Sequence, residues 1–408
     1  MTSYAEATEQ NGVIVALDQE KAYDKISHDY LWRTLEKFNF PAHFINAVRS
    51  LYKHARSLVI INGEMSTYFQ VTRGVRQGDP LSCLLFDLAI EPLACILRKS
   101  NLVGFQVPAY QERLVVQMFA DDTTVFLSEH DNFEYLEDLL KKWCRAARAK
   151  FNVNKTEVIP IGTLEYRNRL LATRRISENR QPLDDSIHIA AEGEAVRILG
   201  AWIGNQAENA APWSPIIQTI TENLARWSRT KPTMYGKKLI IDMEVGGRTQ
   251  YLAKVQGMPK QIQQTLTKII RCFLWNGAKS RVALEKLYQP INKGGFKIMD
   301  LQARLQAIEL TWLKSYLALG KNRPVWAFIA DALIAMNARS SDKKIGNWAK
   351  INIFLQSWDT SARSKLPDEL KRMLTLAKEH HVKFDALQLS NRLKNMLPIW
   401  FHFGAEGS

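Results

Sequence analysis

The sequence predicts an α+β fold in which an antiparallel sheet with helices is followed by a region of helices alone. Apolar runs of strand length occupy residues 13–17, 114–118 and 123–127. From residue 213 onward, apolar side chains recur at intervals of three and four, which is typical of helices. With 408 residues, 46% of them hydrophobic, the chain is long enough for two or three domains.

The first predicted strand covers residues 13–17 and carries Asp18 directly at its end. A turn follows, and then Leu31, Leu35 and Phe38 repeat at helical spacing. A carboxylate at the end of a strand, before a turn and a helix, is placed to face a cleft rather than a core. We therefore treat Asp18 as a candidate functional residue.

Residues 73–82 (RGVRQGDPLS) form a predicted loop before a helix in the apolar segment 83–97. Its glycines allow a ligand to approach the backbone closely, and Pro80 and Ser82 are suited to open a helix. Arg76, like Arg73, offers a guanidinium to phosphate, and Gln77 offers a side-chain amide to a base or sugar edge. Taken alone, the segment is also consistent with an ordinary loop.

The strongest local signal is the pair Asp121-Asp122 between the strand-like runs 114–118 and 123–127. This pattern predicts a hairpin with two adjacent carboxylates at its tip. An ordinary solvated acidic turn has the same appearance. A magnesium site is the alternative, because Mg²⁺ prefers oxygen ligands. If the hairpin lies beside strand 13–17, Asp18 joins the pair, and three carboxylates can hold two metals about 3.5–4 Å apart for phosphoryl transfer.

The remaining segments are predicted from their periodicity. Residues 134–149 form an amphipathic helix, and the Arg-rich segment 164–185 is predicted as a loop or irregular strand pair. Helices are predicted over 261–275 and 301–319. Basic side chains accompany the apolar faces of the helices after residue 213: Lys237, Lys238, Arg248, Lys254, Lys260, Lys268 and Arg271.

The segment 321–408 is predicted to be helical and contains four tryptophans, at positions 326, 348, 358 and 400. Aromatic residues with basic neighbours can stack on bases. At helical spacing they are more typical of a packed core, with base stacking as the alternative.

Charge is unevenly distributed along the chain, whose net charge is +14. Residues 1–160 hold 18 basic and 20 acidic residues, whereas residues 161–408 hold 37 and 21. The first part is thus the acidic one, as a metal site requires, and the second carries the charge expected for contact with a nucleic-acid backbone.

The sequence gives no indication of a zinc site, a membrane helix or a signal peptide. Cys83, Cys95, Cys144 and Cys272 have no zinc-ligand spacing, and we interpret them as reduced core residues. No apolar run reaches the roughly 18 residues of a membrane helix, and no signal-peptide pattern begins the chain. We therefore expect an intracellular protein without membrane segments.

Taken together, the motifs resemble those of a known family. Residues 16–24 (ALDQEKAYD), 73–82 and 119–122 (FADD) are similar to palm motifs A, B and C of reverse transcriptases, most closely those of non-LTR retrotransposons of the long interspersed element class. Residues 150–157 resemble motif D and residues 196–204 resemble motif E. The resemblance covers about residues 11–315, including 273–277 and 293–296 beyond the polymerase core.

The resemblance implies a polymerase palm over residues 1–205, a helical thumb over 206–320 and a C-terminal helical region over 321–408. It implies an RNA-directed DNA polymerase with an RNA template, a DNA primer and dNTPs as partners. Two Mg²⁺ ions, with Mn²⁺ as a substitute, would lower the pKa of the primer 3′-hydroxyl and neutralise the leaving pyrophosphate.

By the resemblance, Asp18, Asp121 and Asp122 are catalytic metal ligands. Tyr23 is the aromatic residue that excludes the ribose 2′-hydroxyl, although a core aromatic would look the same. Lys155 is the motif D lysine, a general acid near the pyrophosphate, although a surface charge would look the same.

Further contacts also follow from the resemblance. Gln77 and Gly78 line the nucleotide pocket together with Arg76, and Leu199 and Gly200 shape the turn that holds the primer end. Asp24 and Asp79 are interpreted as helix-start or loop-fixing residues rather than metal ligands.

The sequence also departs from the family. Fingers before motif A, an endonuclease and a zinc knuckle are not recognisable, so we expect an N-terminally truncated fragment with weak or no activity alone. A catalytically inactive nucleic-acid-binding remnant and a polymerase-fold scaffold are the alternatives. A nuclear location is implied by the resemblance only.

Overall fold

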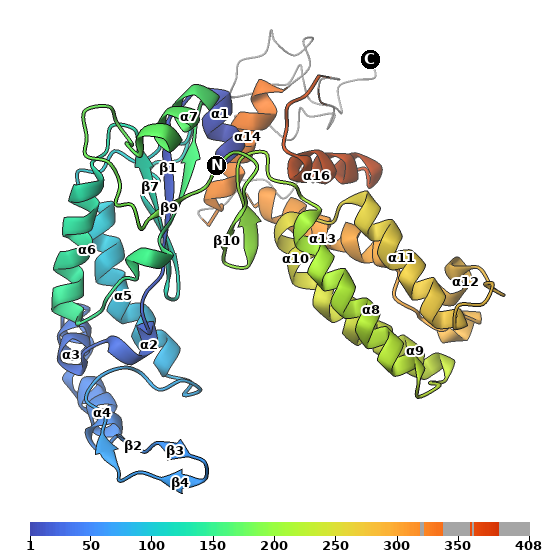
Figure 1. The fold of residues 1–408 in the computed structure, drawn as a ribbon, viewed down its shortest axis with the longest axis horizontal. Coiled ribbons are helices and arrows are strands. Elements are labelled where there is room, and N and C mark those ends of the chain that lie inside the picture. Colours follow the sequence, from blue (N-terminus) through green and yellow to red (C-terminus); the bar gives the residue numbers. More distant parts are fainter. Residues whose placement is uncertain (319–321, 338–359, 361–362, 383–408) are drawn as a thin grey trace, which may run out of the picture. The chain divides into compact units, whose positions relative to one another are not determined.

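The computed structural model describes residues 1–318, 322–337, 360 and 363–382 (Figure 1). They belong to two compact units, residues 1–196 and 197–408. The first unit ends nine residues before position 205, where the sequence places the end of the palm. Trp348, Trp358 and Trp400 lie outside the described residues.

The first unit is built on a five-stranded sheet with the order β6-β7-β1-β8-β9. Its strands are β1 (Gly12–Leu17), β6 (Val116–Phe119), β7 (Asp122–Ser128), β8 (Glu157–Ile161) and β9 (His188–Ile189). All neighbours are antiparallel except β8 and β9. The predicted strands and the hairpin are therefore confirmed, and β1 lies between the hairpin strand β7 and β8.

Helices from three parts of the sequence pack with this sheet in one hydrophobic core. They are α3 (His28–Lys37), α5 (Ser82–Arg98) and α6 (Phe133–Ala147). Val13 and Val15 of β1 are completely buried in the core, as is Phe86 of α5. The predicted helix near 134–149 is confirmed, and the Asn132 side chain caps it by accepting a hydrogen bond from the Glu134 amide.

The remaining elements of this unit include two further helices that contribute to the same core, α4 (Ala42–Lys53) and α7 (Leu164–Thr173), and several short segments. The short segments are α1 (Thr2–Thr8), α2 (Ala22–Lys25), a 3-10 turn (Val153–Lys155) and the small strands β2 (Arg56–Ser57), β3 (Ile60–Ile61), β4 (Glu64–Met65) and β5 (Phe69–Gln70). The small strands form two ribbons, β2 with β5 and β3 with β4, which follow α4 in Figure 1.

Helix α7 contradicts the predicted loop or strand pair over 164–185. Its arginines obscured a short amphipathic pattern, in which Tyr166 and Leu170 are buried. Arg167 is only 1% exposed and lies 3.0 Å from a carboxylate oxygen of Glu192. Local sequence cannot show that an arginine will be neutralised by a residue 25 positions later, and such pairing is what allows its burial.

The boundary between the units falls within β10 (Val196–Ile198), which forms a hairpin with β11 (Ala201–Ile203), and the second unit continues with helices, as predicted. These are α8 (Ser214–Ser228), α9 (Met234–Ile241), a π-helical segment (Asp242–Gly247), α10 (Arg248–Gln256), α11 (Lys260–Trp275), α12 (Leu284–Tyr288), α13 (Leu301–Tyr316), α14 (Val325–Met336) and α16 (Asp368–Glu379), with 3-10 turns at Ala211–Trp213 and Ile291–Lys293. Trp213, Leu266 and Ile270 lie in its core.

Two further expectations can be checked in this fold. All four cysteines are free, as expected, but the prediction that they are core residues is wrong for Cys83 and Cys272, which are exposed. Cys95 is half-buried, and Cys144 packs half-buried against the core. Within the described residues, no helix has the length and hydropathy needed to span a membrane.

Candidate active site

Three carboxylates lie at one edge of the central sheet. Leu17, the last residue of β1, pairs with Thr123 of β7. Asp18, which follows β1, therefore lies next to Asp122, the first residue of β7. Phe119 pairs with Asp122, which leaves a two-residue turn that contains Asp121. The strand order therefore brings Asp18 to the tip of the hairpin, as the sequence predicts.

The three carboxylates influence one another electrostatically. The pKa of Asp122 is raised, first because the side chain is partly buried and then because the negative charges of Asp121 and Asp18 are close. A cation bound at this edge would relieve that repulsion, and carboxylate oxygens are ligands that suit Mg²⁺. In the described part of the chain, no three acidic, histidine or cysteine side chains have the geometry of a metal site.

Tyr23 lies on α2 and packs against α5. Its ring stacks on the buried ring of Phe86, with 4.5 Å between centroids. Burial raises the pKa of the Tyr23 phenol most, followed by a hydrogen bond with Cys83 and by the negative charges of Asp87 and Asp121. Tyr23 is thus a packed aromatic and, at the same time, a neighbour of a candidate metal ligand.

Cys83 and Phe86 were not identified from the sequence. They follow the motif B loop at a spacing of three on α5, which places them on one face of that helix. Their spacing directly after the motif B loop is the one feature of the sequence that points to them. The sequence does not show that this face of α5 contacts Tyr23.

The first part of the motif B loop is attached to motif A by main-chain hydrogen bonds. The Gly74 amide donates to the Ile26 carbonyl and the Val75 amide donates to the Tyr23 carbonyl, each at 2.7 Å. Gly74 has a φ of 82°, and a Cβ atom there would lie 2.8 Å from the Tyr23 carbonyl oxygen. This close approach requires glycine.

The second part of the loop is more open. Gln77 and Gly78 are exposed, and no atom lies within 4 Å of the position where a Cβ of Gly78 would be. Arg76 donates a hydrogen bond to the Leu51 carbonyl at 3.2 Å, and its guanidinium lies over the Tyr52 ring. The structure therefore shows Arg76 engaged by α4.

Asp79 fixes the loop, as the sequence suggests. Its carboxylate accepts a hydrogen bond from the Leu81 amide at 2.8 Å, directly before α5 begins at Ser82. This local bond satisfies one of the free amides at the start of the helix.

Lys155 lies beside the carboxylates. Its Nζ atom is 3.5 Å from Oδ2 of Asp18, with side chains that are 65% and 39% exposed. The Asn152 amide donates to the Asp18 carbonyl at 2.8 Å, which attaches the turn that carries Lys155 to the end of β1. Ion pairs between exposed side chains stabilise a fold only slightly. The contact matters because it places a cation beside Asp18, a candidate metal ligand.

Leu199 and Gly200 form the turn between β10 and β11, with φ values of 50° and 76°. The Tyr251 hydroxyl donates a hydrogen bond to the Leu199 carbonyl. A Cβ atom at Gly200 would lie 2.8 Å from the Tyr251 ring. The Gln256 amide group bonds both the amide and the carbonyl of Trp202, at 3.0 and 3.2 Å.

Helix α10 therefore holds this hairpin through Tyr251 and Gln256. Neither residue was identified from the sequence, because each lies about fifty positions after its partner and no local pattern marks it.

Comparison with known proteins agrees with these motifs. Residues 2–203 match the family described as reverse transcriptase (RNA-dependent DNA polymerase). A transposon TX1 protein of 149 kDa from Xenopus laevis, described as uncharacterized, is 27% identical over 81% of this chain and 24% of that protein. The Pol polyprotein of the R2DM retrotransposable element of Drosophila melanogaster is 30% identical over 36% and 14%.

The chain thus spans about a quarter or less of the length of these two relatives. Among solved structures, telomerase from Candida tropicalis in complex with a telomeric RNA fragment is similar at 13% identity and a TM-score of 0.35, over 78% of this chain and 48% of that one. The family match shows that residues 2–203 belong to the reverse transcriptases, and the similarity to the transposon TX1 and R2DM proteins supports the non-LTR retrotransposon branch of that family.

Proposed function

We propose that this chain is the core of an RNA-directed DNA polymerase that extends a DNA primer along an RNA template from dNTPs. The observation that carries the proposal is the convergence of Asp18, Asp121 and Asp122 at one sheet edge, where the pKa of Asp122 responds to the other two. A scaffold gains nothing from adjacent carboxylates that repel one another, whereas nucleotidyl transfer uses them.

Asp18, Asp121 and Asp122 would hold two Mg²⁺ ions, with Mn²⁺ as a substitute. The bound ions supply a lower pKa at the primer 3′-hydroxyl and neutralise the phosphates. The donor set fits, because all the oxygens are carboxylate oxygens and Mg²⁺ commonly completes its shell with substrate phosphates and water. This also explains why protein atoms alone need not form a full metal cage.

In the reaction, a bond forms between the primer 3′-oxygen and the α-phosphorus as the bond to pyrophosphate breaks. The hydroxyl proton leaves to water, and Lys155 is positioned beside Asp18 to protonate the departing pyrophosphate. Tyr23, held by Phe86, would exclude a ribose 2′-hydroxyl. The exposed Gln77 and Gly78 would contact the nucleotide.

Arg76 would also contact the nucleotide: its guanidinium would give up the hydrogen bond to the Leu51 carbonyl and donate to a phosphate oxygen instead. Leu199 and Gly200 would hold the primer end through the turn that α10 supports.

The test is primer extension on an RNA template with Mg²⁺ and dNTPs, comparing the chain with Asp121→Asn. Asp138→Asn, at an exposed acid on α6, is the matched control. We expect weak extension by the parent and the control, and no detectable extension by Asp121→Asn with unchanged template–primer binding. Binding without extension by the parent would instead identify a nucleic-acid-binding protein without turnover.

A further inference from the structure

Some basic residues of the second unit are already engaged by other protein groups, whereas others are exposed and free to bind a ligand. Lys237 is 5% exposed and donates to the Leu274 carbonyl and the Asn276 side chain at 2.8 and 2.7 Å. It is therefore not part of a basic surface. Lys238 and Arg248 are also engaged, with carboxylates one helical turn away at 2.6 and 2.7 Å.

Helix α11 carries three of the available basic side chains. Lys260, Lys268 and Arg271 are exposed, and among the described residues none of the three forms an ion pair. Positions 260, 264, 268 and 271 follow helical spacing and lie along one stripe, opposite the buried Leu266 and Ile270. The stripe is about 16 Å long at 1.5 Å per residue.

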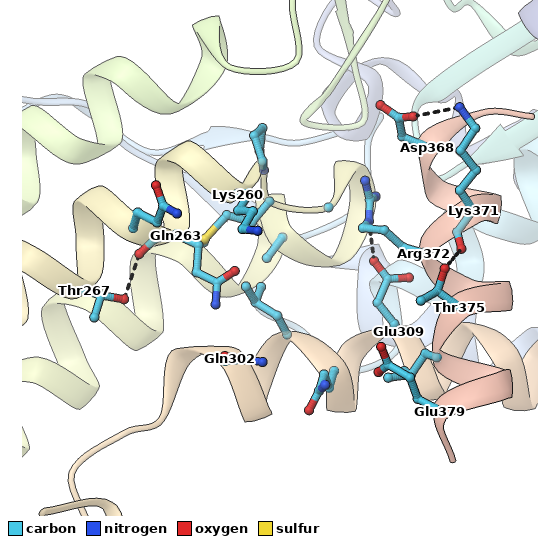
Figure 2. Close-up of a pocket in the computed structure, with 18 of the residues that line it drawn as sticks. Lys260, Gln263, Thr267, Gln302, Glu309, Asp368, Lys371, Arg372, Thr375 and Glu379 are labelled. Carbon is cyan, nitrogen blue, oxygen red and sulfur yellow. Dashed lines mark hydrogen bonds and ion pairs between the residues drawn. The ribbon is translucent and has the colours of Figure 1, made fainter. Parts of the chain in front are cut away.

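This stripe forms one wall of a groove of about 1020 Å³, whose other walls are α13 and α16 (Figure 2). Four glutamines line it and make no side-chain hydrogen bond with any described residue: Gln263, Gln264, Gln302 and Gln306. Their amides offer both donors and acceptors to a ligand.

The α16 wall is fixed by internal ion pairs. Arg372 lies 2.8 Å from Glu309 of α13, and Lys371 lies 3.4 Å from Asp368 (Figure 2). Arg372 also packs on Gly257, where a Cβ atom would clash with its guanidinium. The charges of this wall largely cancel, so the unpaired positive charge of the groove belongs to α11.

The lining residues define the chemistry of the ligand. Nine of the twenty lining residues are lysine, arginine or glutamine, three are acidic (Glu309, Asp368 and Glu379), and none is aromatic. Bases would therefore find no ring to stack on, whereas phosphates and sugar hydroxyls would find cations and amides. Along about 16 Å, one strand of a duplex carries roughly five phosphates at one per 3.4 Å.

We propose that this groove binds the sugar–phosphate backbone of a nucleic acid without regard to sequence. The proposal gives a role to α16, which belongs to the C-terminal region that the family motifs do not reach. It does not depend on polymerase activity, because binding through phosphates needs neither the carboxylates of the first unit nor a nucleotide.

The test measures binding of labelled 20-nucleotide strands by fluorescence anisotropy, with the full chain in EDTA and without dNTPs. The groove variant combines Lys260→Ala, Lys268→Ala and Arg271→Ala. The matched control combines Lys279→Ala, Arg281→Ala and Lys286→Ala, three exposed basic residues of the same unit that do not line the groove. Circular dichroism checks that both variants fold.

We expect at least a tenfold loss of affinity in the groove variant and less than a twofold loss in the control. The slope of log affinity against log salt should become shallower by about 2, the loss of three single-strand phosphate contacts. Homopolymers of different bases should bind equally. Arms with RNA, DNA and a hybrid duplex identify which backbone is preferred.

Equal losses in the two triple variants would overturn the proposal, because the effect would then come from overall charge. A strong preference for one base would also overturn it. So would an acidic peptide that binds the parent as tightly as RNA and loses affinity in the groove variant, since that outcome identifies a protein ligand.

Discussion

The ring of Tyr23 lies nearly parallel to the ring of Phe86, with 15° between their planes and 4.5 Å between their centroids. Phe86 is completely buried in the core of the first unit. Helix α5 therefore fixes the position of Tyr23 in two ways: Phe86 packs against the ring, and Cys83 forms a hydrogen bond with the hydroxyl.

This packing predicts that nucleotide selection depends on the Tyr23 ring rather than on its hydroxyl. Tyr23→Val should lower the preference for dNTPs over rNTPs at least tenfold, because a small side chain leaves room for the 2′-hydroxyl. Single-nucleotide incorporation kinetics measure this ratio. Tyr23→Phe is the control and should keep the preference. An active Tyr23→Val enzyme with unchanged preference would contradict the proposed role.

Gly74 and Gly78 offer a matched pair for stability. Both have positive φ, 82° and 87°, but only Gly74 is in close contact with other backbone atoms. Gly74→Ala should lower the free energy of unfolding by about 3 kcal/mol through strain and overpacking. Gly78→Ala should lower it by about 1 kcal/mol through strain alone. Urea denaturation compares the two, and equal shifts would show that the clash is relieved elsewhere.

His188 makes the stability of the β8–β9 edge dependent on pH. A hydrogen bond with Glu157 raises the pKa of His188 most, and the charges of Glu157 and Glu194 raise it further against a smaller effect of burial. A raised folded-state pKa means that the stabilisation is complete below the ordinary histidine pKa of about 6.5 and is lost as pH rises through the raised value.

His188→Gln should remove this pH dependence. Urea midpoints measured from pH 5 to pH 9 should show the parent losing its advantage over the variant as pH rises. Because the His188 side chain is 45% exposed, we expect a small effect that high salt weakens. Parallel midpoint curves would show that His188 has the same pKa in the folded and unfolded chain.

Tyr251 is predicted to position the turn at Leu199 and Gly200. Tyr251→Phe removes the hydrogen bond to the Leu199 carbonyl but keeps the ring that packs on Gly200. We expect the KM for template–primer to rise severalfold while the KM for dNTP stays unchanged. Steady-state extension kinetics separate the two. A change confined to dNTP would mean that this turn acts at the nucleotide instead.

The sequence was most informative where structure is encoded locally. Runs of β-branched residues around Asp121 predicted the hairpin, and the motifs predicted that Asp18 lies beside it. The helices of the second unit followed from apolar spacing alone.

Features that depend on distant partners could not be predicted. The sequence pattern groups Lys237 with the other basic residues of the helices, but its ammonium is buried and donates to the Leu274 carbonyl. Arg167 looked like part of a loop, although Glu192 allows its burial in α7. The positive charge of the groove along α11 could not be predicted either, because the sequence does not show which basic side chains pair with carboxylates, as Lys238 and Arg248 do.

The contact between Gly200 and Tyr251 also constrains how this sequence can evolve. The ring fills the space that a side chain at position 200 would need, and the positive φ there disfavours most other residues. A lineage that replaces the glycine with asparagine, which tolerates this φ, gains from a smaller residue at position 251, because otherwise the Tyr251 ring has to move away. Positions 200 and 251, far apart in sequence, should therefore change together among descendants of this element.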